Sequence, residues 1–228
     1  MQRNLKPLDH QILFEVDGYT AEICIEPESL DLAYHLRYLA YRHADAIPVN
    51  AEATCTDPYD QQRNARTFLI WHEGRAIASV RSLTWSSEYD WASTPSIKFF
   101  RKQVDQYLGL SSPILESNRY VTAPDFVGRK SLTAQMLLFR IQTLGALADE
   151  CAYVITAVRP RHVKFYERFM NFYSISEPLE VDEVNFEIQL LATPIASKDK
   201  LSQSSSIAAY EEADLVRYTN CLQLLYQS

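Results

Sequence analysis

Alternation of apolar and polar residues predicts the β-strands of this chain. Side chains of a strand point to opposite faces in turn, so a half-buried strand has a period of two, and a strand covered on both faces is apolar throughout. Stretches with these patterns are Thr20–Ile25, Thr67–Trp71, Ala76–Leu83, Leu115–Val121, Ala152–Val158 and Val184–Leu191. The pair Glu73–Gly74 between the second and third stretches suits a tight hairpin.

Apolar residues at helical spacing predict the helices. The clearest helix runs from Ser131 to about Asp149, where apolar residues recur at i, i+3, i+4 and i+7. A second helix is expected to begin after Ser29 as its N-cap and to end near His43. Further helices are expected over 96–108, 161–172 and 207–225.

The order of these elements predicts a mixed α/β sheet with helices packed against it. A chain of 228 residues fits one catalytic domain with a short appendage. We expect an N-terminal tail over 1–18, the domain over 19–195, and a Ser-rich linker with a C-terminal helix over 196–228. The polar stretch 48–66 is expected to be a long loop that borders a site.

Composition excludes several classes of protein. The net charge of -7 disfavours a nucleic-acid partner, because phosphate binding needs a broad basic surface. A hydrophobic fraction of 47% without a long apolar run predicts a soluble protein with no transmembrane segment. The polar start, Met1–Pro7, lacks the apolar core of a secretory signal, so a cytoplasmic protein is expected.

Cysteine spacing and aromatic content bear on ligands. The four cysteines are scattered without a zinc-binding spacing, so we expect reduced thiols and no metal site. Fourteen tyrosines and ten phenylalanines against five glycines suit a pocket for an apolar ligand, and ordinary core packing explains them equally well.

Several short elements resemble LuxI-type acyl-homoserine-lactone synthases in order and spacing. They are Leu36–Tyr41, Asp57–Asp60, Thr67–Trp71, Ala78–Arg81 and Glu116–Arg119. They resemble that family's R-x-x-x-F helix, its D-x-[YF]-D element, its aromatic strand, the arginine of the next strand, and its E-x-[ST]-R strand. In that family a tryptophan that is associated with the S-adenosylmethionine pocket follows the helix. In this chain Ile47 or a neighbouring residue stands in its place.

A second resemblance lies over 158–172. This segment is similar to the N-P-R-H-V-x-F-Y-x-R-x-x-G-F segment of long-chain N-acyl amino acid synthases (FeeM-like), which are relatives of the LuxI type. Arg159 replaces the asparagine and Asn171 replaces the glycine, a mild change because asparagine tolerates a left-handed helix end. Together the two resemblances cover about 20–190. They imply a GNAT-like acyltransferase fold, with a mixed, mainly antiparallel sheet, a splayed parallel strand pair and flanking helices.

These resemblances imply a function. The leading hypothesis is an N-acyltransferase that moves a long-chain fatty acyl group from an acyl carrier protein thioester to the α-amine of an amino acid. The co-substrate would be acyl-acyl carrier protein or acyl-CoA, with no bound cofactor. The partners would then be an acyl carrier protein and a small amino-acid acceptor. The alternatives are an acyl-homoserine-lactone (autoinducer) synthase and a non-catalytic acyl-binding module.

Aminolysis of a thioester needs a neutral amine, a donor set for the oxyanion and a hold on the carrier arm. The expected catalytic residues are Glu116, Arg81 and Asn118. Glu116 is the candidate base, and a structural carboxylate paired to Arg81 or Arg119 is the alternative. Arg81 would hold an acceptor carboxylate or another charged partner in its fork geometry.

The expected substrate-binding residues come from the same elements. They are Arg37, Tyr41, Asp57, Asp60 and Arg119. Asp57 and Asp60 would orient the acceptor ammonium, and Arg37 would pair with one of them. The alternative is that these charges are solvated.

Two segments would bind the acyl carrier. The helix start at Gly128 offers free N–H groups and a favourable dipole to a phosphate, although Leu132 occupies a glycine of the GNAT signature. The basic cluster in 159–168 would dock an acidic carrier protein, or is plain surface charge. The expected carrier-binding residues are Arg129, Lys130, Ser131, Thr133, Arg161, His162 and Tyr166.

Overall fold

The computed structural model describes residues 6–181, 184–195 and 209–227. These residues form one nine-stranded sheet in the order β1-β2-β3-β4-β5-β6-β9-β7, with β8 paired to β9. The strands are β1 (Ile12–Val16), β2 (Tyr19–Cys24), β3 (Ala65–His72), β4 (Arg75–Trp85), β5 (Ile114–Thr122), β6 (Tyr153–Val158), β7 (Tyr173–Ser174), β8 (Leu179–Val181) and β9 (Val184–Pro194). Among these pairings only β5 with β6 is parallel.

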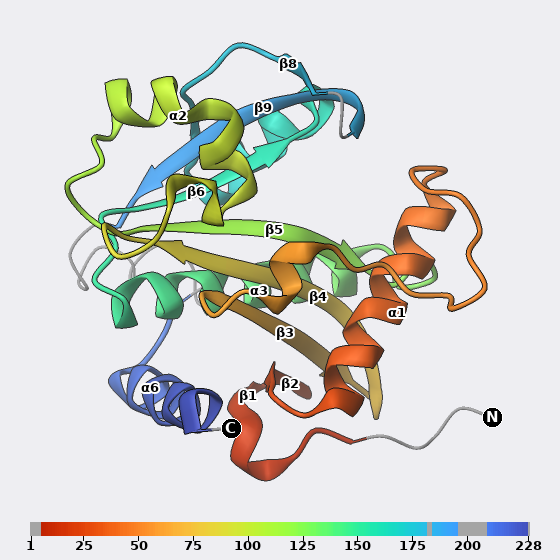
Figure 1. The fold of residues 1–228 in the computed structure, drawn as a ribbon. Helices are drawn as coiled ribbons and strands as arrows, with labels where there is room; N and C mark the ends of the chain where they lie inside the picture. Colours follow the sequence, from red (N-terminus) through yellow and green to blue (C-terminus); the bar gives the residue numbers. More distant parts are fainter. Residues whose placement is uncertain (1–5, 182–183, 196–208, 228) are drawn as a thin grey trace.

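Helices cover both faces of the sheet (Figure 1). They are α1 (Pro27–His43), α2 (Pro95–Tyr107), α3 (Arg129–Ala148), α4 (Val163–Met170) and α6 (Glu212–Gln227). α1 and α2 lie on the face toward the viewer in Figure 1, whereas α3 and α4 lie behind the sheet. The apolar side chains predicted for the central helix, among them Leu137, Ile141 and Leu144, are fully buried.

The parallel strands β5 and β6 separate soon after they meet. They pair at Ile114 with Tyr153, Leu115 with Val154, and Glu116 with Ile155. Beyond these residues both strands continue without further pairing to each other. A bulge bends β5 there: Val80 of β4 faces two residues of β5, and the first of them, Arg119, has φ +53°. Bulges bend the strand that carries them. The predicted splayed pair is therefore present, and it opens toward the carboxyl ends of both strands.

The N-terminus differs from the prediction. Residues 1–18 were expected to form a tail, but β1 pairs antiparallel with β2 and closes one edge of the sheet. Asp17 (φ +50°) and Gly18 (φ +77°) make the turn between them. An Asp–Gly pair is the residue choice that such two-residue hairpin turns require, so the sequence carried a signal for this hairpin.

Two helix boundaries also differ. α1 begins at Pro27 rather than after Ser29, because the fixed φ of proline suits the first helical position. Ser29 instead donates its hydroxyl to the carbonyl of Glu26 at 2.9 Å. The helix expected over 161–172 is a 3-10 turn, Pro160–His162, followed by α4. It ends as expected at Asn171 in the left-handed conformation, with φ +53°.

The C-terminal helix α6 packs against β1 and α3. Its Tyr218 is fully buried, and Arg66 of β3 donates to the hydroxyl of Tyr226 at 2.9 Å. Arg140 of α3 pairs with Asp214 of α6. The linker expected over 196–206 lies outside the described residues.

None of the described helices has an apolar run long enough to cross a bilayer. Over the same residues, no group of three or more His, Cys, Asp or Glu side chains is arranged to hold a metal ion. All four cysteines are free thiols.

Burial of the Glu22 carboxyl group predicts that the stability of the protein depends on pH. Its carboxylate accepts from the indole of Trp71 at 2.5 Å and is 1% exposed, and burial raises its pKa to about 7. The folded state therefore binds a proton that the unfolded state releases near pH 4.5. Stability should fall by up to about 3 kcal/mol as the pH rises from 5 to 8. Thermal unfolding of wild type and Glu22→Gln across that range checks this, and a wild-type slope that survives the substitution would assign it to another group.

Candidate active site

Asp57 is the centre of a buried ionic network. Arg81 binds it with both terminal nitrogens, at 2.6 Å to Oδ1 and 3.1 Å to Oδ2. Arg119 donates to the same Oδ2 from Nε at 3.0 Å, and from its Nη2 as well. One carboxylate therefore holds two guanidinium groups in fixed orientations.

Asp60 extends the network to α1. Arg37 donates to its Oδ1 at 2.7 Å, and Arg81 lies 2.9 Å from the same oxygen. The predicted pairing of Arg37 with one of the two aspartates is thus present. The backbone orients both carboxylates, because the N–H of Tyr59 donates to Asp57 and the N–H of Asp57 donates to Asp60.

Residues that face one another across β3, β4 and β5 form the base of this network. Thr67 of β3 faces Arg81 of β4, and Arg81 faces Asn118 of β5. Arg37 also donates to the hydroxyl of Thr67 at 3.1 Å. The network therefore rests on three neighbouring strands, on the face that α1 covers.

Glu116 joins the network through Asn118. Its Oε1 accepts from the amide of Asn118 and from the hydroxyl of Ser96, both at 2.9 Å, and its Oε2 accepts from the Ser96 N–H at 2.8 Å. Asn118 in turn accepts from Nε of Arg81 at 2.9 Å. The alternative of a direct ion pair between Glu116 and Arg81 or Arg119 is therefore replaced by a link to Arg81 through Asn118.

The pKa values of Asp57 and Glu116 are shifted in opposite directions. Burial opposes ionisation of Asp57, but the guanidinium groups of Arg81 and Arg119 hold its pKa well below its ordinary value. Burial raises the pKa of Glu116, which is fully enclosed, against the hydrogen bonds from Asn118 and Ser96. Asp57 is thus a permanent anion, and Glu116 is a carboxyl group suited to proton transfer.

Arg119 is the arginine of the network that reaches solvent. Its side chain is 31% exposed, against 0% for Arg37 and 1% for Arg81. The three guanidinium groups share the carboxylates of Asp57 and Asp60. Arg119 lies 5.7 Å from the centre of the Tyr41 ring, so the two predicted substrate-binding residues are adjacent. Arg81 was expected to hold an acceptor carboxylate or another charged partner, and in the structure its fork holds the carboxylate of Asp57.

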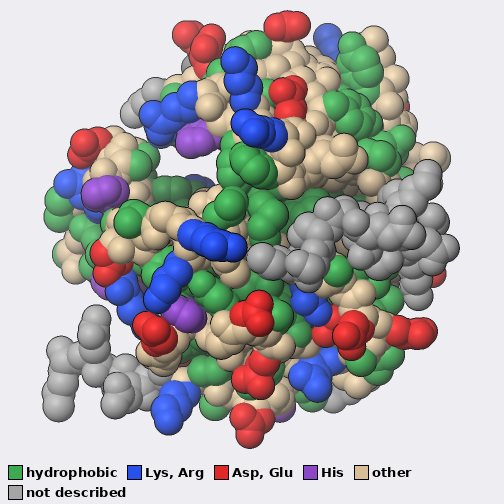
Figure 2. Space-filling view, turned by 180° about the vertical axis from the view of Figure 1, so that it is seen from behind, with side chains coloured by type: hydrophobic (Ala, Val, Ile, Leu, Met, Phe, Trp, Pro, Cys, Tyr) green, Lys and Arg blue, Asp and Glu red, His purple; other side chains and the backbone are tan. Residues whose placement is uncertain are grey.

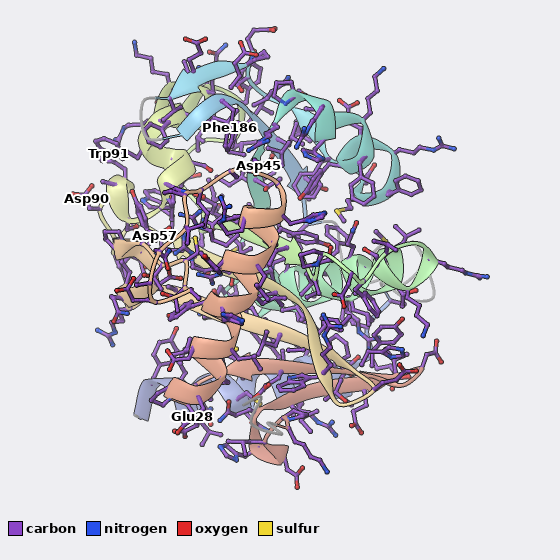
Figure 3. The ribbon with its side chains drawn as sticks, turned by 90° about the vertical axis from the view of Figure 1, so that its right-hand side faces the viewer. Glu28, Asp45, Asp57, Asp90, Trp91 and Phe186 are labelled. Carbon is purple, nitrogen blue, oxygen red and sulfur yellow. The ribbon has the colours of Figure 1, made fainter. Side chains whose placement is uncertain are left out.

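A cleft opens on the side of the molecule that Figure 2 shows. Figure 2 shows a deep hollow between the part of the molecule that carries β8, β9 and α4 and the loop that follows α1, with basic side chains along its rim. In Figure 3, Phe186 of β9 lies above the loop that carries Asp45 and Asp57. The separation of β5 and β6 places their carboxyl ends at this opening.

A pocket of about 490 Å³ lies at the start of α3. It is lined by residues of α1, of the segment after β5, of the first turns of α3 and of α4: Ala40, His43, Thr122, Ala123, Pro124, Phe126, Val127, Gly128, Ser131, Leu132, Gln135 and Phe165. Of the carrier-binding residues expected at this helix start, Ser131 lines the pocket. Arg129, Lys130 and Thr133 do not line it, and Lys130 lies 3.8 Å from Glu73 at the surface. Leu132 stands in the wall where the GNAT pattern has glycine.

The side chains of the expected carrier-binding segment near α4 differ in exposure. Arg161, Lys164 and Arg168 are exposed, whereas Tyr166 is buried and packs against Tyr120. Arg161 donates to the ring of His162 at 3.1 Å. Burial, and then the charges of Arg161 and Arg159, lower the pKa of His162.

Two contributors to the network, and most residues that line the pocket, were not predicted as site residues. Ser96 supplies two hydrogen bonds to Glu116 from the start of α2. Thr67 accepts from Arg37, and Phe165 closes the pocket at α3. A polar position inside the apolar strand 67–71 was a signal for Thr67. The sequence has no such signal for Ser96.

Comparison with known proteins connects this geometry to a family. The family model described as N-acyl amino acid synthase FeeM matches residues 32–194, a range that includes the whole network and the pocket. A search of curated proteins gives no match.

Three solved structures illustrate the fold. FeeM, an N-acyl amino acid synthase from uncultured soil microbes, is 15% identical with a TM-score of 0.64, over 83% of this chain and 96% of that one. The CoA-dependent acyl-homoserine lactone synthase BjaI is 14% identical with a TM-score of 0.62, over 88% and 99%. An acyl-CoA N-acyltransferase from Pseudomonas aeruginosa is 16% identical with a TM-score of 0.50, over 76% and 97%. The predicted GNAT-like fold class is confirmed.

Proposed function

Since the chain belongs to the family of the N-acyl amino acid synthase FeeM and is an acyltransferase, we propose that it acylates the α-amine of an amino acid. The acyl donor is a long-chain thioester of an acyl carrier protein. The observation that carries the proposal is the match of the family model over 32–194, which spans every residue of the Asp57 network.

The pocket at α3 receives the carrier arm. Its apolar walls, among them Phe126 and Phe165, suit a pantetheine chain, and the first N–H groups of α3 suit its phosphate. The arm then runs into the gap between β5 and β6, where the bulge at Arg119 interrupts the ladder between β4 and β5. Backbone N–H groups beside this bulge stabilise the oxyanion of the tetrahedral intermediate.

The acceptor amine approaches from the cleft. It attacks the thioester carbonyl, a C–N bond forms, the C–S bond breaks, and the carrier thiolate leaves and takes up a proton. Glu116 accepts the proton of the amine through a water at Oε2, because Oε1 already accepts from Ser96 and Asn118 whereas Oε2 accepts only from the Ser96 N–H. Asp57 is held by two guanidinium groups, so its role is to fix Arg81 and Arg119 rather than to bind the ammonium directly.

The exposed cations of α4 and of the 3-10 turn that precedes it dock the carrier. Arg161, Lys164 and Arg168 give an acidic chain a local basic surface beside the cleft. Complementary charge of this kind raises association rates and is screened by salt.

Product analysis tests the proposal. Purified protein is incubated with long-chain acyl-acyl carrier protein, or with the matching acyl-CoA, and a mixture of the amino acids. Mass spectrometry is expected to detect an N-acyl amino acid, formed faster from the carrier-protein thioester. Release of methylthioadenosine when S-adenosylmethionine is supplied would instead favour a lactone synthase. Binding of the thioester without turnover would favour the acyl-binding module.

A further inference from the structure

Arg159 occupies an unusual position between the end of β6 and the side of β9. It follows the last residue of β6, and β9 extends past that end: Val158 pairs with Gln189, and Phe186 lies three residues farther along β9. The guanidinium carbon of Arg159 lies 3.7 Å from the centre of the Phe186 ring. Stacking fixes the plane of the guanidinium group and leaves its N–H edge available for hydrogen bonds.

Arg159 has no acidic partner among the described residues. Neither an ion pair nor a hydrogen bond from its side chain to a carboxylate is present there, although the residue is half-buried. Burial, followed by the charge of Arg161, lowers its pKa. A half-buried cation that is oriented by an aromatic ring but not neutralised is suited to bind an anion.

Tyr41 connects Arg159 to the buried network. Tyr41 lies within electrostatic range of Arg159 and of Arg119, and the guanidinium carbon of Arg119 lies 5.7 Å from the Tyr41 ring centre. Arg119 is paired with Asp57 and is partly exposed. The two guanidinium groups therefore lie near Tyr41, where the ends of β5 and β6 are apart.

We infer that Arg159, with Arg119 and Tyr41, forms an anion site that binds the carboxylate of the amino-acid acceptor. The inference rests on the proposed function and names the group by which the acceptor is recognised. The donor phosphate has a separate location at the start of α3, in a pocket that Arg159 does not line. Arg159 stands where the resembling segment has asparagine, so this cation distinguishes the present chain.

Steady-state kinetics of Arg159→Asn and Arg159→Lys test the site. Loss of a charge-assisted pair should raise the KM for the amino acid about 10- to 100-fold in the asparagine variant, with kcat and the KM for acyl-acyl carrier protein unchanged. The lysine variant keeps the charge and should recover part of the loss. The matched control is Arg101→Asn, because Arg101 also stacks on an aromatic ring, 5.3 Å from the centre of Trp91, on the exposed side of α2.

A binding experiment separates failure of this inference from failure of the proposed function. N-dodecanoylglycine and N-dodecanoylethanolamine differ in whether a carboxylate or a hydroxyl ends the molecule, and calorimetry measures both without turnover. Wild type should prefer the carboxylate, and Arg159→Asn should reduce that preference about 10-fold or more. Turnover with an unchanged preference and unchanged KM would overturn the anion site and leave the function intact. A raised KM for the acyl carrier would place the donor phosphate there and also overturn it. Absence of turnover with every amino acid would refute the function alone.

Discussion

Replacement of Asp57 by asparagine is expected to lower the free energy of unfolding by about 3–5 kcal/mol, because removal of one partner from a buried ion pair leaves the other charge uncompensated. Here two guanidinium groups lose their partner, those of Arg81 and Arg119. An asparagine that keeps one oxygen toward Arg81 must turn its amide toward another N–H donor, so no orientation restores the contacts. We also expect most of the turnover to be lost, because Arg81 orients Asn118.

The pH dependence of this effect has a defined sign. Arg81 and Arg119 depress the pKa of Asp57 against the effect of burial. The stability that Asp57 contributes is therefore fully present above its unfolded pKa, near 4, and is lost as the pH falls through the lower folded value. Thermal unfolding at pH 7 should show a decrease in Tm of roughly 6–20 °C for the variant. The difference between wild type and variant should narrow below pH 4.

The chain provides a matched control for this experiment. Arg75 and Asp125 also form a two-pronged pair, with one contact of 2.6 Å, but both side chains are more than half exposed. Solvent-exposed pairs contribute little. Asp125→Asn should therefore leave the Tm unchanged. Equal effects of the two substitutions would mean that burial of the Asp57 network has no energetic consequence.

Part of this network was predictable from the sequence, but the direction of the Arg119 side chain of β5 was not. Glu116 and Asn118 are two residues apart in a strand, so their side chains share a face. Regular alternation would put Arg119 on the opposite face, yet it reaches Asp57 on the same side as Asn118. The bulge at Arg119 re-aims it. The residues of the site follow from the motif, but the reach of Arg119 depends on a register shift that no local pattern indicates.

Contacts between segments distant in sequence account for the other omissions. Ser96 meets Glu116 because α2 crosses the sheet beside β5, which depends on the packing of Phe100 and Val104 against Trp85 and Ile114. No periodicity within 86–113 specifies that crossing. The central helix was predictable because its apolar stripe is a property of one segment. The acidic partner of a serine in another segment is a property of the tertiary fold.

Replacement of Glu116 by glutamine is expected to reduce turnover about 100-fold or more, because general-base catalysis typically contributes a factor of that size. The hydrogen bonds that Glu116 accepts also predict a loss of stability in this variant. Asn118 directs its oxygen to Arg81, so its amide must face an acceptor at position 116. The other oxygen of Glu116 accepts from the Ser96 N–H. A glutamine places its amide against one of these donors, which should also cost about 1–3 kcal/mol of stability.

The pH profile distinguishes a base from a carboxylate that only positions Asn118. Burial raises the pKa of Glu116, so wild-type kcat/KM should rise with pH through a value above that of an ordinary glutamate, as the carboxylate ionises. In Glu116→Gln that acid limb should disappear and the low residual rate should be flat across it. Glu116→Asp retains the charge and serves as the control, with an acid limb still present. If the glutamine variant keeps the limb at a reduced rate, another group takes the proton and Glu116 acts by positioning Arg81 through Asn118. Full turnover of the variant at every pH would exclude the base role, because proton transfer requires an ionisable group at this position.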